Sequence, residues 1–260
     1  MANDCLSPMR SCLGHLLSTV LLVAGLPTGA PLAQTQPPIK SETLAGPNTL
    51  GAAAKPATDK TVTLAMKIPR YVPPFMGAPG GRVVGGSRSA PTGCTVDSLA
   101  VLAPDDRALT STQAPELYWY VSNDITPVRT EIRVTDPAAR ATIYRKDVAG
   151  RIGKGFHRVS LEEDNIKLEA GKSYQWSVSL VCDDQKRAAD TVSAAKLEYL
   201  PSSPEIVKLI AQTPFQDLAA AYAASGYWYD AFAATNPISS DASNAARDTL
   251  LNQVDLAKHL

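Results

Sequence analysis

The chain has 260 residues, with 25 basic and 25 acidic side chains, ordinary apolar content and 20 prolines that concentrate in its first third. This is an ordinary soluble composition with an irregular front end. The zero net charge hides a split, because residues 1–93 carry eight Lys or Arg and three Asp or Glu, whereas residues 94–260 carry seventeen and twenty-two. The acidic body, whose basic residues are interleaved with carboxylates, argues against a nucleic-acid partner.

The N-terminus is typical of an export signal. Arg10 supplies the positive charge, residues 13–24 form an apolar stretch, and small and helix-breaking residues follow. The apolar stretch is too short to span a bilayer, so we predict no transmembrane segment. Cleavage after Ala33 is the preferred choice, which makes 1–33 the signal peptide and predicts a periplasmic or extracellular protein.

Two cysteines, Cys94 and Cys182, remain once the signal is removed. An even pair in an oxidising compartment is most simply one disulfide. The alternative is two buried free thiols. A metal site is disfavoured because two ligands do not fill a tetrahedron.

Residues 34–92 are rich in proline, glycine and alanine and are interpreted as a linker arm. Within this arm, residues 62–68 could add an edge strand. A glycine-rich stretch, Tyr71–Arg88, could let the backbone approach a phosphate, but the lysine and hydroxyl residue of a phosphate-binding loop do not follow it. The eight basic charges of the front end form only a weak patch, so a solvated arm is preferred over contact with lipid or polysaccharide.

Between residues 93 and 200 the sequence predicts about seven strands separated by turn residues. The expected strands are 97–102, 116–122, 130–135, 141–148, 156–161, 173–182 and 190–199. Their number and spacing favour a mainly β fold, an antiparallel β-sandwich. In the last strand the apolar residues change phase near Ala194 and Ala195, which suggests a β-bulge.

The strand over 173–182 is the clearest of the set, because its even-numbered residues are apolar, aromatic or cysteine and most of the odd ones are small and polar. The turn before it, Leu168–Tyr174, resembles the tyrosine corner of immunoglobulin-like and fibronectin-like sandwiches, in which a tyrosine at the head of a late strand bonds back across the connection. Cys94 precedes the first strand, so the inter-sheet cysteine pair of those domains is not reproduced. The resemblance therefore implies architecture and no function.

Beyond residue 200 the apolar period changes to that of helices, which predicts a C-terminal α-helical appendage over 201–260. Ser203 and Pro204 form a helix start, and Ile206, Val207, Leu209 and Ile210 give that helix an apolar face. Further helices are expected over 215–225, closed by Gly226, over 227–234, and over 242–257. The pattern from Leu218 to Ala231 resembles the first half of one tetratricopeptide repeat, which favours a helical hairpin folded against the sheets over a peptide-binding groove.

Aromatic residues are the main candidates for a binding surface. Tyr118 and Tyr120 share one face of a strand, and Tyr227, Trp228 and Tyr229 are consecutive in the helical part. Such residues on an exported sandwich suit stacking against a sugar or a peptide. The alternative, and the preferred one, is that they pack against one another and hold the helices to the sheet.

No catalytic residue, cofactor site or metal site is predicted. His157 and His259 are the only histidines after signal removal, and the alternation around His157 favours a partly buried structural role. Acidic runs at 105–106, 162–164 and 183–184 fall at strand ends or turns, where such residues are common.

Four segments together, Gly77–Arg88, Tyr118–Val121, Gly171–Cys182 and Gly226–Ala231, resemble an exported cyanobacterial family catalogued as domain of unknown function 928. The resemblance implies an extracytoplasmic location and no activity. The sequence thus favours a non-enzymatic interaction module that binds a protein or a cell-envelope polymer. A carbohydrate-binding module is the alternative, and a hydrolase with a carboxylate pair is a weaker one.

Overall fold

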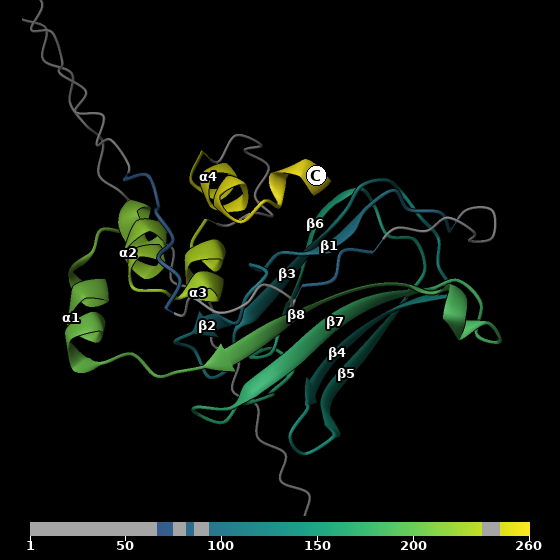
Figure 1. Cartoon of the computed structure of the whole chain (residues 1–260), viewed down its shortest axis with the longest axis horizontal. Coiled ribbons are helices and arrows are strands. Elements are labelled where there is room, and N and C mark those ends of the chain that lie inside the picture. The colour runs from purple at the N-terminus through teal and green to yellow at the C-terminus, as the bar shows by residue number, and fades with distance from the viewer. Residues whose placement is uncertain (1–66, 75–81, 86–93, 236–244) are drawn as a thin grey trace, which may run out of the picture. The chain divides into compact units, whose positions relative to one another are not determined.

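The computed structural model describes residues 67–74, 82–85, 94–235 and 245–260 (Figure 1). The expected signal peptide at 1–33 and most of the expected arm at 34–92 lie outside the described residues. Of the possible edge strand at 62–68, only Lys67 and Ile68 are described, and neither is in a strand.

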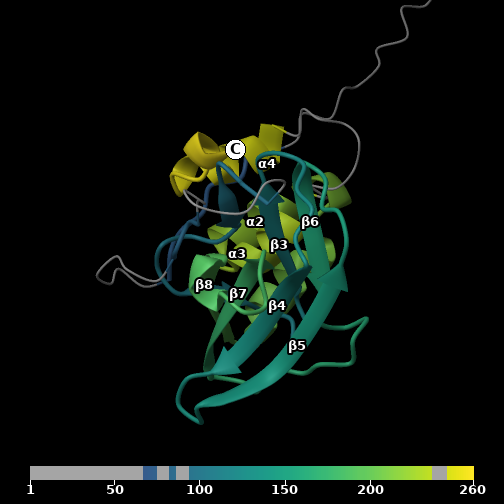
Figure 2. The same cartoon turned by 90° about the vertical axis from the view of Figure 1, so that its right-hand side faces the viewer.

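Eight strands form two sheets in the described part of the chain. They are β1 (Leu99–Val101), β2 (Ala108–Thr110), β3 (Glu116–Val121), β4 (Arg129–Asp136), β5 (Ala141–Ala149), β6 (Gly155–Ser160), β7 (Ser173–Val181) and β8 (Thr191–Tyr199). One sheet has the order β1-β3-β6 and the other the order β2-β8-β7-β4-β5. All pairs are antiparallel except β2 with β8. The edge strands β5 and β6 face the viewer in Figure 2, with α2 and α3 behind them.

The seven strands predicted from the sequence are present, with ends within two residues of those expected. In β7 the alternation gives the expected result, because Tyr174, Trp176 and Val178 are buried while Gln175 is exposed. Tyr174 also bonds back across the preceding turn, since its hydroxyl accepts a hydrogen bond from the Glu169 N–H at 3.0 Å. Buried side chains from both sheets meet in one hydrophobic core.

The predicted bulge in β8 is wrong. Strands β7 and β8 stay in register from Ser173 opposite Glu198 to Leu180 opposite Thr191. The apolar phase changes near Ala194 because Ser193, Ala194 and Ala195 are all buried, so side chains on both faces of this part of β8 are covered. A register shift occurs instead between β4 and β5, at Val134 and Thr135.

Residues 82–85 join the two sheets. Val83 exchanges two backbone hydrogen bonds with Ala194 of β8, and Gly85 exchanges two with Leu99 of β1. Gly85, within the glycine-rich stretch, thus serves close packing, because a Cβ there would lie 2.6 Å from the Val192 carbonyl oxygen. Arg82 secures the segment further by donating hydrogen bonds of 3.0 Å to the carbonyls of Ala103 and Val254.

The predicted disulfide is confirmed. Cys94 and Cys182 are bonded, with their Cα atoms 5.9 Å apart. Cys94 precedes β1 of the three-stranded sheet, and Cys182 follows β7 of the five-stranded one, so the bond links the two sheets. The two residues are 88 positions apart, and closing so long a loop stabilises the fold by roughly 4–5 kcal/mol in the chain-entropy model.

The helices follow β8 in the order expected from the sequence. They are α1 (Pro204–Gln212), α2 (Leu218–Ala224), α3 (Trp228–Ala233) and α4 (Ala245–Gln253). Short 3-10 turns lie before β8 at Arg187–Ala189 (η1) and after it at Phe215–Asp217 (η2) and Ala257–His259 (η3). Ser203 caps α1, because its hydroxyl accepts a hydrogen bond from the Ile206 N–H. Gly226 takes a φ of 84° between α2 and α3, a left-handed conformation that favours glycine.

We expect Gly85→Ala to lower the free energy of unfolding by about 1–3 kcal/mol, since backbone and side-chain atoms of β8 occupy the space of the added methyl group. Gly153→Ala is the matched control, because its Cβ would lie 3.8 Å from the nearest atom, Asp124 Oδ1. The control should change stability by less than about 0.5 kcal/mol. Urea unfolding of both variants measures the difference, and equal stability would contradict the packing role of Gly85.

Candidate functional site

The five aromatic residues proposed as a binding surface are all buried. Their exposed fractions are 5% or less for Tyr118, Tyr120, Tyr227, Trp228 and Tyr229. The expectation of an exposed aromatic face is therefore wrong. These side chains hold the helices to the sheets, which is the alternative that the sequence favoured.

Contacts from distant parts of the chain cover the two strand tyrosines. The Tyr118 ring packs edge-on against Phe232 of α3, with the ring centroids 5.4 Å apart. The Tyr120 hydroxyl donates a hydrogen bond of 2.7 Å to the Leu260 carbonyl, and its ring packs against Phe156. Because the outer face of β3 is covered in this way, it is closed to a sugar or peptide.

The start of α3 bonds to both sheets. The Trp228 indole N–H donates to the Leu102 carbonyl, which follows β1, at 2.8 Å. The Tyr229 hydroxyl donates to the Lys196 carbonyl in β8 and accepts from the indole N–H of Trp176 in β7, each at 2.9 Å. Burial raises the pKa of Tyr229 well above its usual range, so the hydroxyl stays protonated.

The next residue, Asp230, is a buried carboxylate with three hydrogen-bond donors. Oδ2 accepts from the Ser111 N–H at 2.9 Å, and Oδ1 accepts from the hydroxyls of Ser111 and Thr112 at 2.8 and 2.9 Å. Burial raises the pKa of this carboxyl, and the three donors oppose that shift. Asp230 thereby fixes α3 to the loop between β2 and β3.

Helix α1 differs from the other three helices, because none of its residues is buried. In Figure 1 it lies beside α2, on the side away from the strands. Four large apolar side chains near it are exposed: Val207 by 55% and Leu209 by 49% in α1, Phe215 by 79% in the turn that follows, and Ile68 by 75%. We call these four residues the α1 surface. Apolar side chains gathered in this way are typical of interaction sites.

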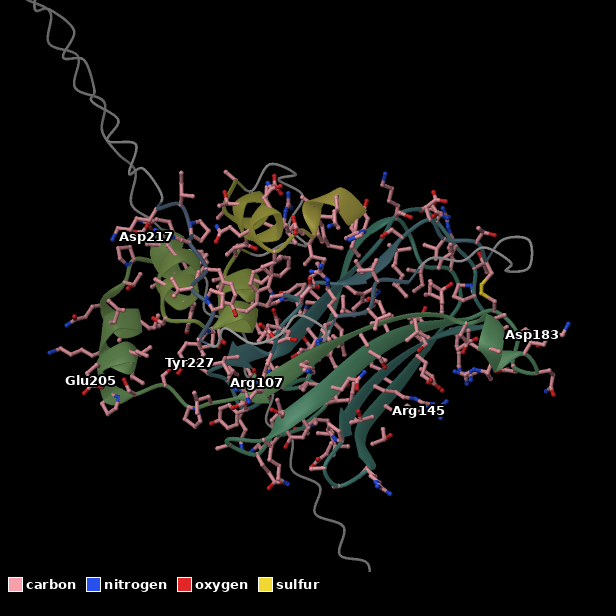
Figure 3. All side chains as sticks on the ribbon, viewed as in Figure 1. Arg107, Arg145, Asp183, Glu205, Asp217 and Tyr227 are labelled. Carbon is pink, nitrogen blue, oxygen red and sulfur yellow. A yellow bond between two sulfur atoms is a disulfide. The ribbon has the colours of Figure 1, made fainter. Side chains whose placement is uncertain are left out.

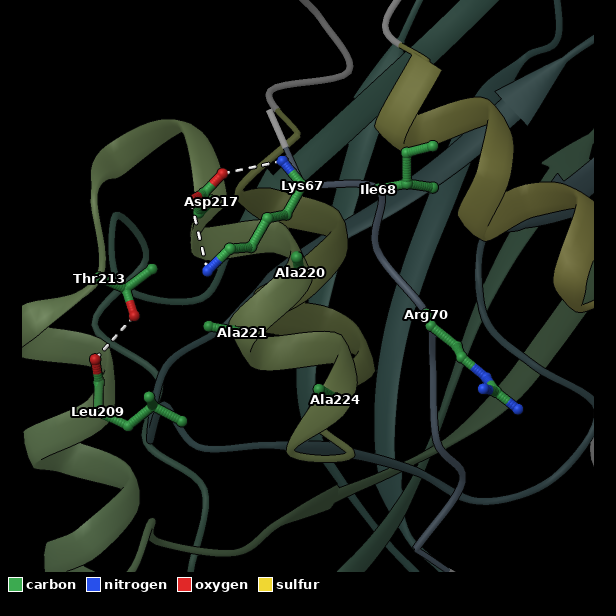
Figure 4. Close-up of a pocket in the computed structure, with 9 residues that line it drawn as sticks. All are labelled: Lys67, Ile68, Arg70, Leu209, Thr213, Asp217, Ala220, Ala221 and Ala224. Carbon is green, nitrogen blue, oxygen red and sulfur yellow. Dashed lines mark hydrogen bonds and ion pairs between the residues drawn. The ribbon is translucent and has the colours of Figure 1, made fainter. Parts of the chain in front are cut away.

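A cavity of about 600 Å³ opens between α1, α2 and the segment that begins at Lys67 (Figure 4). Its lining is Lys67, Ile68, Arg70, Leu209, Thr213, Asp217, Ala220, Ala221 and Ala224. A second cavity, of about 470 Å³, is lined by Ser111, Pro201, Ser202, Val207, Ile210, Ala211 and Tyr222. Because cavities lie beside both Leu209 and Val207, helix α1 leaves apolar side chains accessible on two of its flanks.

Two cations and one carboxylate line the larger cavity. Lys67 Nζ lies 3.9 Å from Asp217 Oδ2, and the Lys67 N–H donates to Oδ1 of the same carboxylate at 2.9 Å. Arg70 is exposed and forms no ion pair with another described residue. The cavity thus combines apolar walls with one available positive charge.

Figure 3 shows Asp217 beside the helices, well away from Arg145 on β5.

The remaining titratable candidates have structural partners. His157 is partly buried, stacks on Trp119 with the rings 5.5 Å apart, and has its Nε2 2.7 Å from the Gly153 carbonyl. The acidic runs each contribute to local ion pairs: Asp105 with Arg82 at 2.9 Å, Asp164 with Lys146 at 2.8 Å, and Asp184 with Arg129. Ion pairing with Lys146 and a hydrogen bond from Tyr144 lower the pKa of Asp164.

Residues 83–259 match the family model described as Domain of Unknown Function (DUF928). The chain belongs to this family. No curated protein matches the chain. The DUF928 match includes the sheets and all four helices, and it begins after the segment around Lys67.

Within the described parts of this DUF928 protein, no group of three or more His, Cys, Asp or Glu side chains is placed to hold a metal ion. None of the helices described is both long enough and apolar enough to cross a membrane.

The sequence indicated part of this site. The apolar face of α1 was readable from its period, and the pattern also identified its start. Ile68 and Arg70 could not be assigned to the site, because they come from a segment about 140 residues earlier that resembles a linker. Phe215 gave no signal of its own, since an aromatic residue at a helix start is equally compatible with a buried position.

We expect Asp230→Ala to destabilise the protein by about 1–3 kcal/mol, because it leaves the Ser111 N–H without its acceptor. Asp230→Asn should cost less, since an amide oxygen can still accept that bond. Both variants remove the charge, and only Asn keeps the acceptor and nearly the volume of Asp, so thermal melting of the two compares losing the charge alone with losing the whole group. Equal losses in both would contradict the role given to the acceptor.

The buried carboxyl of Asp230 also predicts that the stability of the protein depends on pH. The pKa of Asp230 is raised in the folded state, so the folded protein binds this proton more tightly than the unfolded one, whose carboxyl titrates near about 4. The contribution of Asp230 to stability is therefore greatest below about pH 4 and falls as the pH rises through the folded pKa. The free energy of unfolding is measured across this range for the unaltered protein and for Asp230→Asn. With rising pH the unaltered protein should lose stability relative to the variant, and a difference that stays constant with pH would contradict the prediction.

Proposed function

We propose that the protein is an exported, non-enzymatic interaction module that binds a protein partner through the α1 surface. The observation that carries this proposal is the exposure of Val207, Leu209, Phe215 and Ile68. Leu209 and Ile68 line the cavity of about 600 Å³, and Val207 lines the one of about 470 Å³. An amphipathic helix normally buries its apolar face in its own domain, and α1 buries none of its residues.

The charges at the cavity indicate the chemistry of the partner. Asp217 already binds Lys67, whereas Arg70 is exposed and forms no ion pair with another described residue. A partner segment with a bulky apolar side chain for the cavity and a carboxylate beside it would satisfy both the apolar walls and the guanidinium of Arg70. The partner segment thus carries both a bulky apolar side chain and a carboxylate, and it belongs to a protein of the cell envelope.

Export is supported by the signal-like pattern over residues 1–33 and by the disulfide between Cys94 and Cys182, since such bonds persist in oxidising compartments. We place the protein in the periplasm or outside the cell, and its source among the cyanobacteria that the sequence resemblance indicates.

We further infer an immunoglobulin-like or fibronectin-like β-sandwich. The strand orders β1-β3-β6 and β2-β8-β7-β4-β5 support this inference. With β2 set aside, one sheet holds the first, second and fifth of the remaining seven strands and the other holds the rest. The bond of the Tyr174 hydroxyl to the Glu169 N–H supports it as well, since it has the form of a tyrosine corner.

The α1 surface is tested with the triple variant Val207→Ser, Leu209→Ser and Phe215→Ser. The matched control is a second triple variant, Val128→Ser, Val148→Ser and Val192→Ser, whose side chains are 51%, 36% and 38% exposed on the β part of the chain. All six positions are exposed, so we expect each triple variant to fold, which melting curves verify.

Both triple variants and the unaltered protein are immobilised and incubated with envelope extract, and bound proteins are quantified by mass spectrometry. We expect a protein that the unaltered chain and the control retain equally and that the α1 variant loses by tenfold or more. The same set of proteins on all three samples would overturn the proposed surface.

A further inference from the structure

Residues 67–74, which we call the strap, run in an extended conformation alongside α2 and reach α4. The Lys67 N–H donates to Asp217 Oδ1 at 2.9 Å, just before α2, and the Val72 N–H donates to the Ala223 carbonyl at its end, at 3.0 Å. The strap therefore follows the length of α2 and is bonded at both ends.

The side chain of Gln253, in the last turn of α4, bonds to the backbone in the middle of the strap. Its Oε1 accepts from the Tyr71 N–H at 2.7 Å, and its Nε2 donates to the Pro69 carbonyl at 2.9 Å. A side-chain amide that bonds one donor and one acceptor of an extended chain recognises the backbone conformation and not the side chains between them. Proteins that bind extended peptides use contacts of this kind.

Two residues of the strap are buried, Pro69 and Tyr71, and Tyr71 is the aromatic one. Tyr71 is 8% exposed, and its ring lies edge-on against Trp228 with the centroids 5.1 Å apart. The residues on either side of it, Arg70 and Val72, are exposed. A buried aromatic residue flanked by exposed ones, with the backbone hydrogen-bonded close by, is the arrangement of a peptide ligand with one aromatic anchor.

Gly226 lets the strap approach closely. Its φ of 84° is strained for other residues, and a Cβ there would lie 3.2 Å from the Val72 carbonyl oxygen and 3.4 Å from Pro74. The surface under the strap is thus shaped by Asp217, Ala223, Gly226, Trp228 and Gln253, all of which lie within the family match at 83–259. The strap itself lies outside that match.

We propose that this surface is a binding groove for an extended peptide with one aromatic anchor, and that the strap is the ligand that occupies it in this chain. The groove belongs to the family unit, whereas its occupant comes from the segment before it. A partner peptide would present an aromatic side chain to Trp228 and its backbone to Gln253, in exchange for the strap. The strap contributes Ile68 to the α1 surface and Arg70 to the cavity beside it. The two proposals are tested at different residues, because the α1 triple variant leaves Tyr71 and Gln253 unchanged, so either can fail without the other.

The probe is a fluorescein-labelled peptide with the sequence of residues 67–74, followed by fluorescence anisotropy. The full-length Tyr71→Ala variant, whose strap lacks its anchor, should bind the peptide, and the unaltered protein should bind it at least tenfold more weakly. Adding Gln253→Ala to the Tyr71→Ala variant should weaken binding by tenfold or more, and a peptide with alanine in place of tyrosine should not bind. No binding to the Tyr71→Ala variant, or equal binding to all samples, would overturn the proposal.

A second variant covers the case in which Tyr71→Ala does not fold. A protease site is inserted between residues 75 and 81 of the full chain, which is folded first and then cut. We expect the cut N-terminal fragment to exchange with the labelled peptide while circular dichroism of the remainder is unchanged. If the fragment leaves only when the remainder unfolds, the strap is an integral part of the core and the groove is not a binding site.

Discussion

The fold depends on three consecutive side chains at the start of α3. Trp228 bonds to the end of β1, Tyr229 to β7 and β8, and Asp230 to the loop after β2. Each is a polar group inside the protein, and such a group is costly unless it finds its partner. Because the partners belong to both sheets, only one placement of α3 satisfies all three groups, and that placement closes the core between the sheets and the helices.

This use of the aromatic residues determines where partners can bind. The residues best suited to stacking on a ligand hold the helices instead, whereas Val207 and Leu209 of α1 are accessible and take no part in that network. The strap uses the same network from its other side, since Tyr71 rests on the ring of Trp228. One aromatic residue thus supports both the core and the groove.

Local patterns predicted the strands and helices well. Alternation identified β7, and a serine followed by a proline identified the start of α1, because both signals lie within a few residues. Strand β2 was missed, since three residues carry no period and its pairing with β8 is a tertiary contact. Burial of Tyr118 and Tyr120 was equally out of reach, because the groups that cover them, Phe232 and Leu260, lie more than 110 residues further along the chain. Alternation shows which side chains share a face and not what covers that face.

The long span of the strap contacts has a consequence for synthesis. The Tyr71 N–H meets its acceptor on Gln253, 182 residues later. During translation the strap therefore emerges long before α4 exists, and it stays unbonded while the strands are made. Contacts between such distant residues form late and slow the completion of folding. Until α4 is in place, the Tyr71 N–H and the Pro69 carbonyl lack the Gln253 amide that bonds them in the folded protein.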